Sequence, residues 1–377
     1  MSTVERVAIV GYHQLKPALN DNRGRYEAIF KTVRGALDSA GLKRKDVTTV
    51  VSATNDFYDG RTISNCWTVE AGGAYMKDET KVEMDGAYAI LYGLMRVMSG
   101  HHKLAVVWGA SQASCFPYDS TRLQMTDPTF ERQVGFVNHY TAAGFGMRAY
   151  LERHGLSAEE VAKIVVKNRA NAAKNEFALP ESKVPVTVEE VLSAPVLASP
   201  VTEPMYSVPC DGAACVLLAP ERQALKITDD PVWITGVGFS QETYYLGDRD
   251  LATSSSAKKA AQAAYQMADV KDPVKDVQVA EIYEAFAHEE AILAEALGLA
   301  KEGAGCTPDV PVNQSGGAQS GNALCATGIV RVIEAARQVR GEAGDHQVSG
   351  VQRAVALGQE GFAAQNAIVY VLEGGKK

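Results

Sequence analysis

Apolar and polar positions alternate between two patterns along the first part of the chain. Short apolar runs rich in β-branched residues, VAIVG at 7–11 and VTTVVSAT at 47–54, predict strands, and LAVVWGAS at 104–111 predicts another. The segments between them, at 25–41 and 86–98, have the residue pattern of helices. Strands that alternate with helices predict a mainly parallel sheet covered by helices on both faces.

The second half of the chain repeats this order of elements. Val7 and Val232 are as far apart as Gly11 and Gly236, so the strand-like segments of the two halves correspond. We therefore predict a duplicated α/β chain in which each half contributes a sheet and a central buried helix. The predicted strands lie at 232–238, 277–286 and 353–358, and the predicted helices lie near 254–268 and 321–340.

A long insertion is predicted between the halves. It has little strand pattern, and its helical segment begins at Ser157 with Glu160 at the spacing of a capping box. An insertion of this length predicts a flap over a site. We place the first half at 1–119 plus 201–225, the insertion at 120–200 and the second half at 226–377.

The stretch VEMDGAYAILYGLMRVMSG predicts a buried helix with an acidic start. Residues 86–98 are small or apolar on nearly all sides, which is typical of a helix without a solvent-facing side. Glu83 and Asp85 precede it, at the end where backbone N–H groups favour negative charge. Two interpretations follow. Asp85 is an N-cap beside a solvated Glu83, or this helix start holds a reactive or anionic group.

The second half contains a matching helix in GNALCATGIVRVIEAARQVRG. It ends at Gly341 much as the first buried helix ends at Gly100. If a pseudo-twofold axis relates the halves, the N-termini of these two helices approach each other near the middle of the molecule. The duplication therefore places the acidic helix start beside a second helix start.

Composition and charge narrow the class of protein. The 377 residues carry a net charge of −8 without a block of lysines or arginines, which argues against nucleic acid as the main partner. A phosphorylated ligand remains compatible, since a few local positive groups suffice. The six cysteines form no CxxC pair, so neither a zinc site nor a disulfide framework is predicted. MSTVER leads directly into VAIVG, and no apolar run approaches a membrane span, so we expect a cytoplasmic protein.

Several segments together resemble the thiolase superfamily, in particular the sterol-carrier-protein-type thiolases and their relatives that work with a separate OB-fold, zinc-ribbon partner. The resemblance implies a duplicated, five-layered αβαβα fold with two mixed sheets and buried central helices. It also implies an acyl-CoA substrate, coenzyme A as part of that substrate rather than a bound cofactor, and a homodimeric core. The segments are NAAKN, VLSAPVLASPVTEPMYSVPCDGAACVLLA, EIYEAF, PVNQSGGAQSGNALCATG and EAARQVRG, in that order.

The resemblance implies a site that departs from the usual thiolase pattern. Thiolases use a nucleophilic cysteine at the start of the first buried helix, and here Glu83 takes that position, or Met84 or Asp85 if the alignment slips. Tyr283 replaces the oxyanion-binding Asn or His of the NEAF-type motif. In SGNALCATG, Asn322 replaces the histidine of the GHP motif.

Further candidates surround these positions. Cys325 replaces a glycine after the GHP motif, and His288 lies one helical turn beyond Glu284. Simpler interpretations are a small buried hydrophobe for Cys325, a core aromatic for Tyr283 and an N-cap for Asn322. Gly361, near the position of the second thiolase cysteine, Gly317 in the SGG segment and His139 in the predicted flap are the candidate substrate-binding residues.

Three functions agree with this site. In the first, the chain is an enzyme subunit that makes or breaks a carbon–carbon bond beside a CoA thioester, by retro-Claisen or retro-aldol chemistry, as in steroid side-chain aldolases and heteromeric thiolases. In the second, Cys325 is a relocated nucleophile and thiolysis survives. In the third, the chain is a non-catalytic paralogue that supports an active thiolase subunit.

Overall fold

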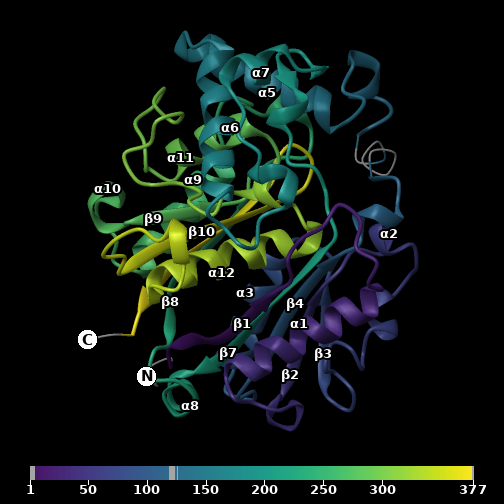
Figure 1. Ribbon diagram of the computed structural model, residues 1–377, viewed down its shortest axis with the longest axis vertical. Helices are drawn as coiled ribbons and strands as arrows, with labels where there is room; N and C mark the ends of the chain where they lie inside the picture. Colours follow the sequence, from purple (N-terminus) through teal and green to yellow (C-terminus); the bar gives the residue numbers. More distant parts are fainter. Residues whose placement is uncertain (1–4, 119–123, 125, 376–377) are drawn as a thin grey trace.

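The computed structural model describes residues 5–118, 124 and 126–375. The strands of its main sheet lie in the order β3-β2-β4-β7-β1-β8-β11-β10-β9, and a two-stranded sheet of β5 and β6 lies apart from it (Figure 1). The main strands are β1 (Val7–Gln14), β2 (Thr49–Ala53), β3 (Asp78–Val82), β4 (Ala105–Ser111), β7 (Gly212–Pro220), β8 (Val232–Gln241), β9 (Val279–Ile282), β10 (Arg353–Glu360) and β11 (Asn366–Gly374).

Helices cover both faces of this sheet and form a separate group at the top of Figure 1. The helices that pack on the sheet are α1 (Arg25–Ser39), α3 (Gly86–Met98), α9 (Ser255–Met267), α11 (Ala287–Ala296) and α12 (Thr327–Arg340). The group at the top contains α5 (His139–His154), α6 (Ala158–Ala172) and α7 (Val188–Ser193). Short helices α2 (Asp56–Asp59), α8 (Glu221–Ile227) and α10 (Pro273–Asp276) lie in connections.

The two halves of the chain have the same strand pairing. In the first half β2 pairs in parallel with β3 and β4, while β7 runs antiparallel to β4 and β1. In the second half β9 pairs in parallel with β10, while β11 runs antiparallel to β10 and β8. An isolated parallel bridge between Ala280 and Val312 takes the place that β3 has in the first half.

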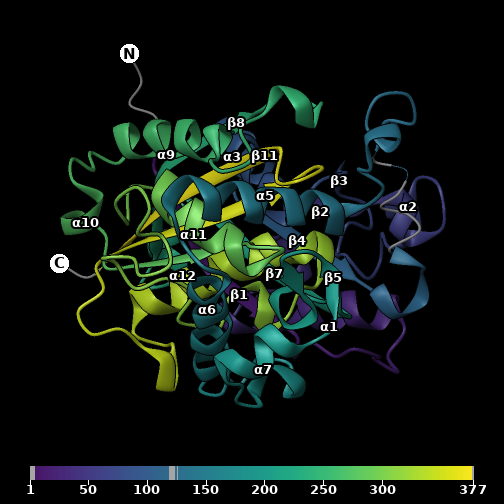
Figure 2. The same ribbon diagram turned by 90° about the horizontal axis from the view of Figure 1, so that it is seen from above.

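The two predicted sheets are joined edge to edge. Only the pairs Ala8–Trp233 and Ile9–Val232 connect β1 to β8. Ile9 faces the central helices, whereas Ala8 and Val10 face α1, as expected for alternating strand residues. The helices α3 and α12 share one core between the half-sheets, and α9 covers the opposite face of the second half (Figure 2). The predicted duplicated αβαβα fold is confirmed.

The structure differs from the sequence-based elements in its strands and in one helix start. The strands β3, β7 and β11 lie outside the predicted set, although β7 and β11 are continuous apolar runs of the kind expected for buried strands. The helix predicted near 321–340 begins only at Thr327. Before it, residues Leu324–Ala326 form a tight turn in which Cys325 has a φ of 26°, which interrupts helical geometry.

The insertion between the halves is helical and has its own core. Met147 and Tyr150 of α5 and Ile164 of α6 pack with Phe286 and Ile292 at the start and middle of α11. Strands β5 (Val196–Ala198) and β6 (Val201–Thr202) complete this part. The insertion therefore lies on the second half of the chain, over the segment that carries EIYEAF.

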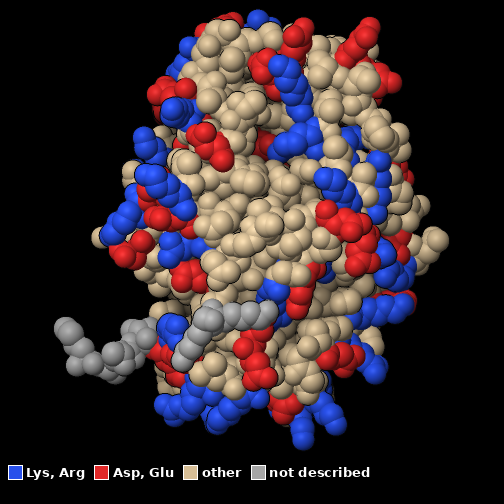
Figure 3. Space-filling view, turned by 60° about the vertical axis from the view of Figure 1, so that its left-hand side comes forward, with Lys and Arg blue, Asp and Glu red and all other residues tan. Residues whose placement is uncertain are grey.

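The surface supports the exclusions made from composition. On the face in Figure 3, acidic and basic side chains are interspersed around a broad area that has neither. Such a mixed face gives no continuous basic stripe for a phosphate backbone. Within the described residues, no helix has the length and apolarity needed to cross a lipid bilayer.

Asp85 connects the two central helices at their N-termini. It is the N-cap of α3, and its Oδ1 accepts a hydrogen bond from Ala87 N at 3.0 Å. Its Oδ2 accepts from Gly328 N in the first turn of α12 at 2.9 Å. The side chain is 1 % exposed. One carboxylate therefore satisfies N–H groups of both helix ends, and the predicted approach of the two N-termini is observed.

The close approach of these helix ends requires glycine. A Cβ atom on Gly86 would lie 2.5 Å from Ile329 Cγ1 and 2.6 Å from the carbonyl oxygen of Cys325. Contacts this short are not tolerated in a packed core. The glycine therefore lets the start of α3 lie directly against the start of α12.

We predict that Asp85→Ala lowers the free energy of unfolding by roughly 2–4 kcal/mol, because two buried N–H groups lose their acceptor. Urea unfolding at constant pH measures this change. The control is Asn138→Ala, which removes an N-cap from α5 alone and is expected to cost about 1 kcal/mol. Equal losses in the two variants would contradict the bridging role of Asp85.

A second prediction concerns pH. Burial raises the pKa of Asp85 to about 7, while its bonds to Ala87 N and Gly328 N oppose that rise. The folded state therefore holds this proton more tightly than the unfolded state, so the free energy of unfolding falls as pH rises from about 4 to about 7. Asp85→Asn cannot titrate. The difference in unfolding free energy between wild type and this variant should shrink across that window, and a difference independent of pH would refute the assignment.

Candidate active site

A cavity opens at the N-termini of the two central helices. Its floor comes from the helix starts and the end of β10, and its wall comes from α2, from the insertion with the residues on either side of it, and from the segment that leads into α11. The floor is lined by Asp85, Asn322, Leu324, Cys325, Gln359, Glu360 and Gly361. The wall is lined mainly by Tyr58, Tyr118, His139, Tyr206, Tyr283, Phe286 and His288.

Tyr283 and Asn322 meet in this cavity. The Tyr283 hydroxyl donates to Asn322 Oδ1 at 3.0 Å, and the Thr327 hydroxyl donates to the same oxygen at 3.0 Å. Asn322 Nδ2 donates to the carbonyl oxygen of Ser207 at 2.9 Å. These bonds fix the orientation of the amide, so that its oxygen faces the two hydroxyls. The two positions singled out in EIYEAF and SGNALCATG therefore form one hydrogen-bonded unit.

His288 points into the same cavity from the first turn of α11. It is 3 % exposed, and its Nδ1 has no hydrogen-bond partner among the described residues. Burial lowers the pKa of His288 to about 3, so the ring is neutral near pH 7. Gly146 on α5 makes room for it, since a Cβ there would lie 3.2 Å from His288 Nε2. A neutral imidazole can donate one hydrogen bond to a ligand without carrying charge.

Glu83 does not line the cavity. It is exposed, accepts a hydrogen bond from Asp56 N at 2.8 Å and lies 3.7 Å from Lys81 Nζ. The placement predicted by aligning Glu83 with the thiolase nucleophile is therefore wrong. The reason is local, because α3 starts at Gly86 with Asp85 as its cap, and the chain before the cap turns away towards α2. The carboxylate at the helix tip is that of Asp85.

Cys325 is the one cysteine among the described cavity-lining residues. It is 8 % exposed and lies in the turn before α12. Burial and the nearby charge of Glu360 raise the pKa of the Cys325 thiol well above its usual range. The thiol is therefore protonated near neutral pH, whereas nucleophilic cysteines are activated by a lowered pKa.

Glu360 is a cavity residue that the sequence interpretation missed. It lies at the end of β10, half-buried, and its charge contributes to the raised pKa values of Asp85 and Cys325. The sequence did indicate this part of the chain, because Gly361, the residue after Glu360, aligns near the second thiolase cysteine. The carboxylate that faces the cavity belongs to the residue before it.

Of the three candidate substrate-binding residues, two line the cavity and one does not. Gly361 and His139 line the cavity, and their role in substrate binding stays a prediction. Gly317 lies outside the described lining, and a Cβ atom added to it would collide with the side chains of Glu284 and Asn313. Its φ of 66° and this close packing give Gly317 a structural place in the loop before α12. Gly317 therefore does not line the described cavity, and its role in substrate binding stays a prediction.

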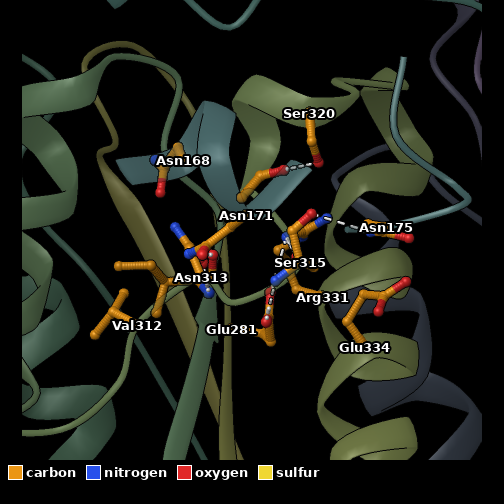
Figure 4. Close-up of polar contacts among 12 residues, drawn as sticks. Asn168, Asn171, Asn175, Glu281, Val312, Asn313, Ser315, Ser320, Arg331 and Glu334 are labelled. Carbon is orange, nitrogen blue, oxygen red and sulfur yellow. Dashed lines mark hydrogen bonds and ion pairs between the residues drawn. The ribbon is translucent and has the colours of Figure 1, made fainter. Parts of the chain in front are cut away.

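The NAAKN segment holds the loop that carries Asn322. Asn171 Nδ2 donates to the carbonyl of Asn313 at 3.0 Å, and Asn175 Nδ2 donates to the carbonyl of Ser315 at 3.0 Å. Figure 4 shows both side chains pointing towards this loop, Asn171 from the last turn of α6 and Asn175 from the segment after it. Buried amides with satisfied hydrogen bonds order a segment that lacks regular structure.

A buried ion pair between Arg331 and Glu281 also contacts the loop that carries Asn322. Arg331 Nη1 on α12 donates to Glu281 Oε2 on β9 at 3.0 Å and to Ser315 Oγ at 2.8 Å (Figure 4). Ser315 N in turn donates to Glu281 Oε1 at 3.0 Å. The loop is thus tied to the strand before Tyr283 and to the helix after Asn322. This network therefore helps to hold Tyr283 and Asn322 in position relative to each other.

Comparison with known proteins agrees with this architecture. Residues 238–373 match the family described as thiolase C-terminal domain-like. An acetyl-CoA acetyltransferase of Methanocaldococcus jannaschii is 30% identical over 354 residues, which cover 87% of this chain and 88% of that protein. Sterol carrier protein 2 of Gallus gallus is 28% identical over 242 residues, which cover 60% of this chain and 43% of that protein.

The chain is also similar in fold to a solved structure. The structure described as Ltp2-ChsH2(DUF35) aldolase matches with a TM-score of 0.84 at 19% identity, and the match covers 100% of both chains. The fold, the ordered motifs and the relatives agree. The chain belongs to the thiolase superfamily, in its sterol-carrier-protein-type branch.

Proposed function

We propose that the chain makes or breaks a carbon–carbon bond beside a CoA thioester without forming an acyl-enzyme. The observation that carries this proposal is the chemistry of the cavity floor. The tip of α3 presents the Asp85 carboxylate instead of a thiol, and the thiol of Cys325 is held protonated. An acyl group on a carboxylate is an anhydride, which water hydrolyses readily. A retro-aldol reaction, or its reverse, needs no such intermediate.

The reaction needs a base, hydrogen-bond donors and a route for one proton. Glu360 accepts the proton of a β-hydroxyl group, the Cα–Cβ bond breaks, and a carbonyl group forms at Cβ. The electron pair of the broken bond passes to the thioester oxygen as an enolate. In this proposal the second N–H of Asn322 Nδ2, whose first N–H donates to Ser207 O, and the neutral ring of His288 donate to that oxygen. Tyr283, hydrogen-bonded to Asn322, returns a proton to the α-carbon.

The role of His288 follows from its neutrality. An imidazole with a pKa near 3 is a poor base, but its N–H group donates to an enolate oxygen without giving up the proton. In this proposal the base is therefore Glu360, and neither His288 nor Glu83 takes that role. Coenzyme A enters as part of the substrate.

A second candidate function rests on Cys325. Its left-handed backbone, with a φ of 26°, directs this residue to the cavity floor, where a relocated nucleophile would stand. Thiolysis through Cys325 needs a thiolate, and the burial that raises the thiol pKa opposes it. The third function, a non-catalytic paralogue, assigns no chemical role to the hydrogen-bonded side chains of Tyr283 and Asn322.

Partners are also part of the proposal. The solved aldolase of similar fold is described with ChsH2(DUF35), which supports a partner of the OB-fold, zinc-ribbon kind for this chain. We further propose a homodimeric core and a cytoplasmic location. Co-purification from the native source, followed by mass determination of the complex, tests the partner and the dimer together.

The test of the function uses 3-hydroxy-3-phenylpropionyl-CoA, from which retro-aldol cleavage releases benzaldehyde and acetyl-CoA. We expect Glu360→Gln and Tyr283→Phe to lower kcat at least 100-fold, because each removes a proton-transfer group. Cys325→Ala should stay within about threefold of wild type, since no covalent step uses the thiol. Chromatographic measurement of acetyl-CoA gives the rates.

Glu83→Gln is the matched control, because it makes the same change as Glu360→Gln at a carboxylate outside the cavity. It should leave kcat unchanged. Loss of activity in Cys325→Ala would establish the relocated nucleophile instead. Unchanged rates in both Glu360→Gln and Tyr283→Phe would reject the proposed function.

A further inference from the structure

The turn that follows Glu360 has a left-handed backbone at three positions. Strand β10 ends at Glu360, and residues 361–365 connect it to β11. Gly361 has a φ of 87°, and Ala363 and Ala364 have φ values of 50° and 54°. Left-handed backbone is sparsely populated for residues with a Cβ atom, and it persists where other contacts fix it. The 361–365 turn therefore needs support from elsewhere in the chain.

Arg249 gives the turn that support. Its Nη1 donates to the carbonyl oxygen of Phe362 at 2.8 Å, and its Nη2 donates to the carbonyl oxygen of Ala363 at 2.5 Å. The side chain is 6 % exposed and lines the candidate active site. A guanidinium presents its donors in a rigid fork, so these bonds hold two successive carbonyl groups in one orientation. Arg249 therefore fixes the turn at its left-handed part.

Glu242 holds the Arg249 side chain in place. Glu242 Oε2 accepts from Arg249 Nε at 2.8 Å, and Glu242 Oε1 accepts from Ser256 N in the first turn of α9 at 3.0 Å. Glu242 N donates to the carbonyl oxygen of Gln365 at 3.0 Å, and Gln365 Nε2 donates to that of Glu242 at 2.9 Å. The charge of Arg249 is thus paired, and each of its guanidinium nitrogens donates within the chain. Arg249 lines the cavity as a support for the turn rather than as an anion-binding group.

The turn in its own right orients the Glu360 carboxylate. Gly361 N donates to Glu360 Oε1 at 3.0 Å, so the carboxylate follows the first peptide group of the turn. The Phe362 side chain is 1 % exposed and packs with Ala142 of α5 and with Leu246. The turn is therefore held by its buried ring on one side and by the Arg249 fork at its carbonyl groups. A change in the fork moves the peptide group that bonds the carboxylate.

We infer that Arg249 is a positioning residue for the proposed reaction, acting through the 361–365 turn to set where the Glu360 carboxylate lies in the cavity. The inference rests on the proposed function, because that function assigns the role of base to Glu360. A shift of about 1 Å in a catalytic group costs roughly 100-fold in rate. Loss of the fork therefore appears in kcat, while the groups that would contact the substrate stay in place.

Steady-state kinetics with 3-hydroxy-3-phenylpropionyl-CoA test this role. We expect Arg249→Gln to lower kcat roughly 10- to 100-fold and to leave KM within about threefold of wild type. Arg153→Gln is the matched control. Arg153 forms a two-bond ion pair with Asp250, the residue after Arg249, at 2.7 and 2.9 Å, and neither partner is among the described lining residues of the cavity. The control should keep the wild-type kcat.

Two further measurements separate positioning from general damage. If Arg249 acts through Glu360, adding Arg249→Gln to Glu360→Gln should lower kcat by less than about threefold more. Hydrogen exchange followed by mass spectrometry should show faster exchange at the 361–365 turn in Arg249→Gln and unchanged exchange in Arg153→Gln. Arg249→Lys keeps the charge beside Glu242 without the fork, so it should lose kcat in the same way even if Arg249→Gln fails to fold. Circular dichroism verifies the fold of each variant.

Wild-type kcat in a folded Arg249→Gln or Arg249→Lys variant would overturn the inference, and so would full multiplication of the two losses in the double variant. These results are separable from failure of the proposed function. Wild-type kcat in Glu360→Gln rejects the proposed function, and with it the base that Arg249 is inferred to position. Loss of kcat in Glu360→Gln, with unchanged kcat and exchange in Arg249→Gln, rejects the positioning role alone.

Discussion

The structure depends on the meeting of two helix N-termini at the centre of the molecule. Each helix start presents backbone N–H groups that need acceptors, and packing them end to end concentrates positive dipole ends in one place. Asp85 satisfies both starts with one carboxylate. Gly86 allows the contact, because any side chain would collide with α12. The cavity opens at this junction, so its floor combines helix dipoles with buried acidic groups.

The electrostatics of this floor follow from burial. The Asp85 carboxyl and the Cys325 thiol are buried beside Glu360, and burial together with the charge of Glu360 makes ionisation of both groups less favourable. A cysteine in such surroundings keeps its proton. An imidazole buried nearby stays neutral for the same reason, as His288 does. The cavity at the helix tips is thus present, while the conditions for a thiolate nucleophile are absent at the described cavity residues.

The periodicity of the sequence predicted much of the fold. Apolar runs and duplicated spacing indicated the layers, the repeat of the halves and the approach of the two helix starts. The strands β7 and β11 were missed because continuous apolar runs do not separate buried strands from buried helices. The late start of α12 was missed because the left-handed backbone of Cys325 has no signal in the residue pattern.

The candidate site was predicted less completely. Tyr283 and Asn322 could be found because each stands at a fixed place in a motif. Glu83 was assigned wrongly because the cap residue, rather than the spacing to Gly86, decides which carboxylate faces inward. Glu360 was missed because strand β10 brings it to the cavity from a distant part of the chain. Its neighbour Gly361 indicated this part of the chain, but only the fold shows which carboxylate lines the cavity.

The most direct test of the central claim is intact-mass spectrometry of the protein after rapid mixing with an acyl-CoA and an acid quench. The account predicts that the mass of the chain stays unchanged, because no side chain of the cavity carries the acyl group. A mass increase equal to the acyl group, mapped by peptide fragmentation to Cys325, would contradict it and establish a covalent thiolase mechanism on this fold.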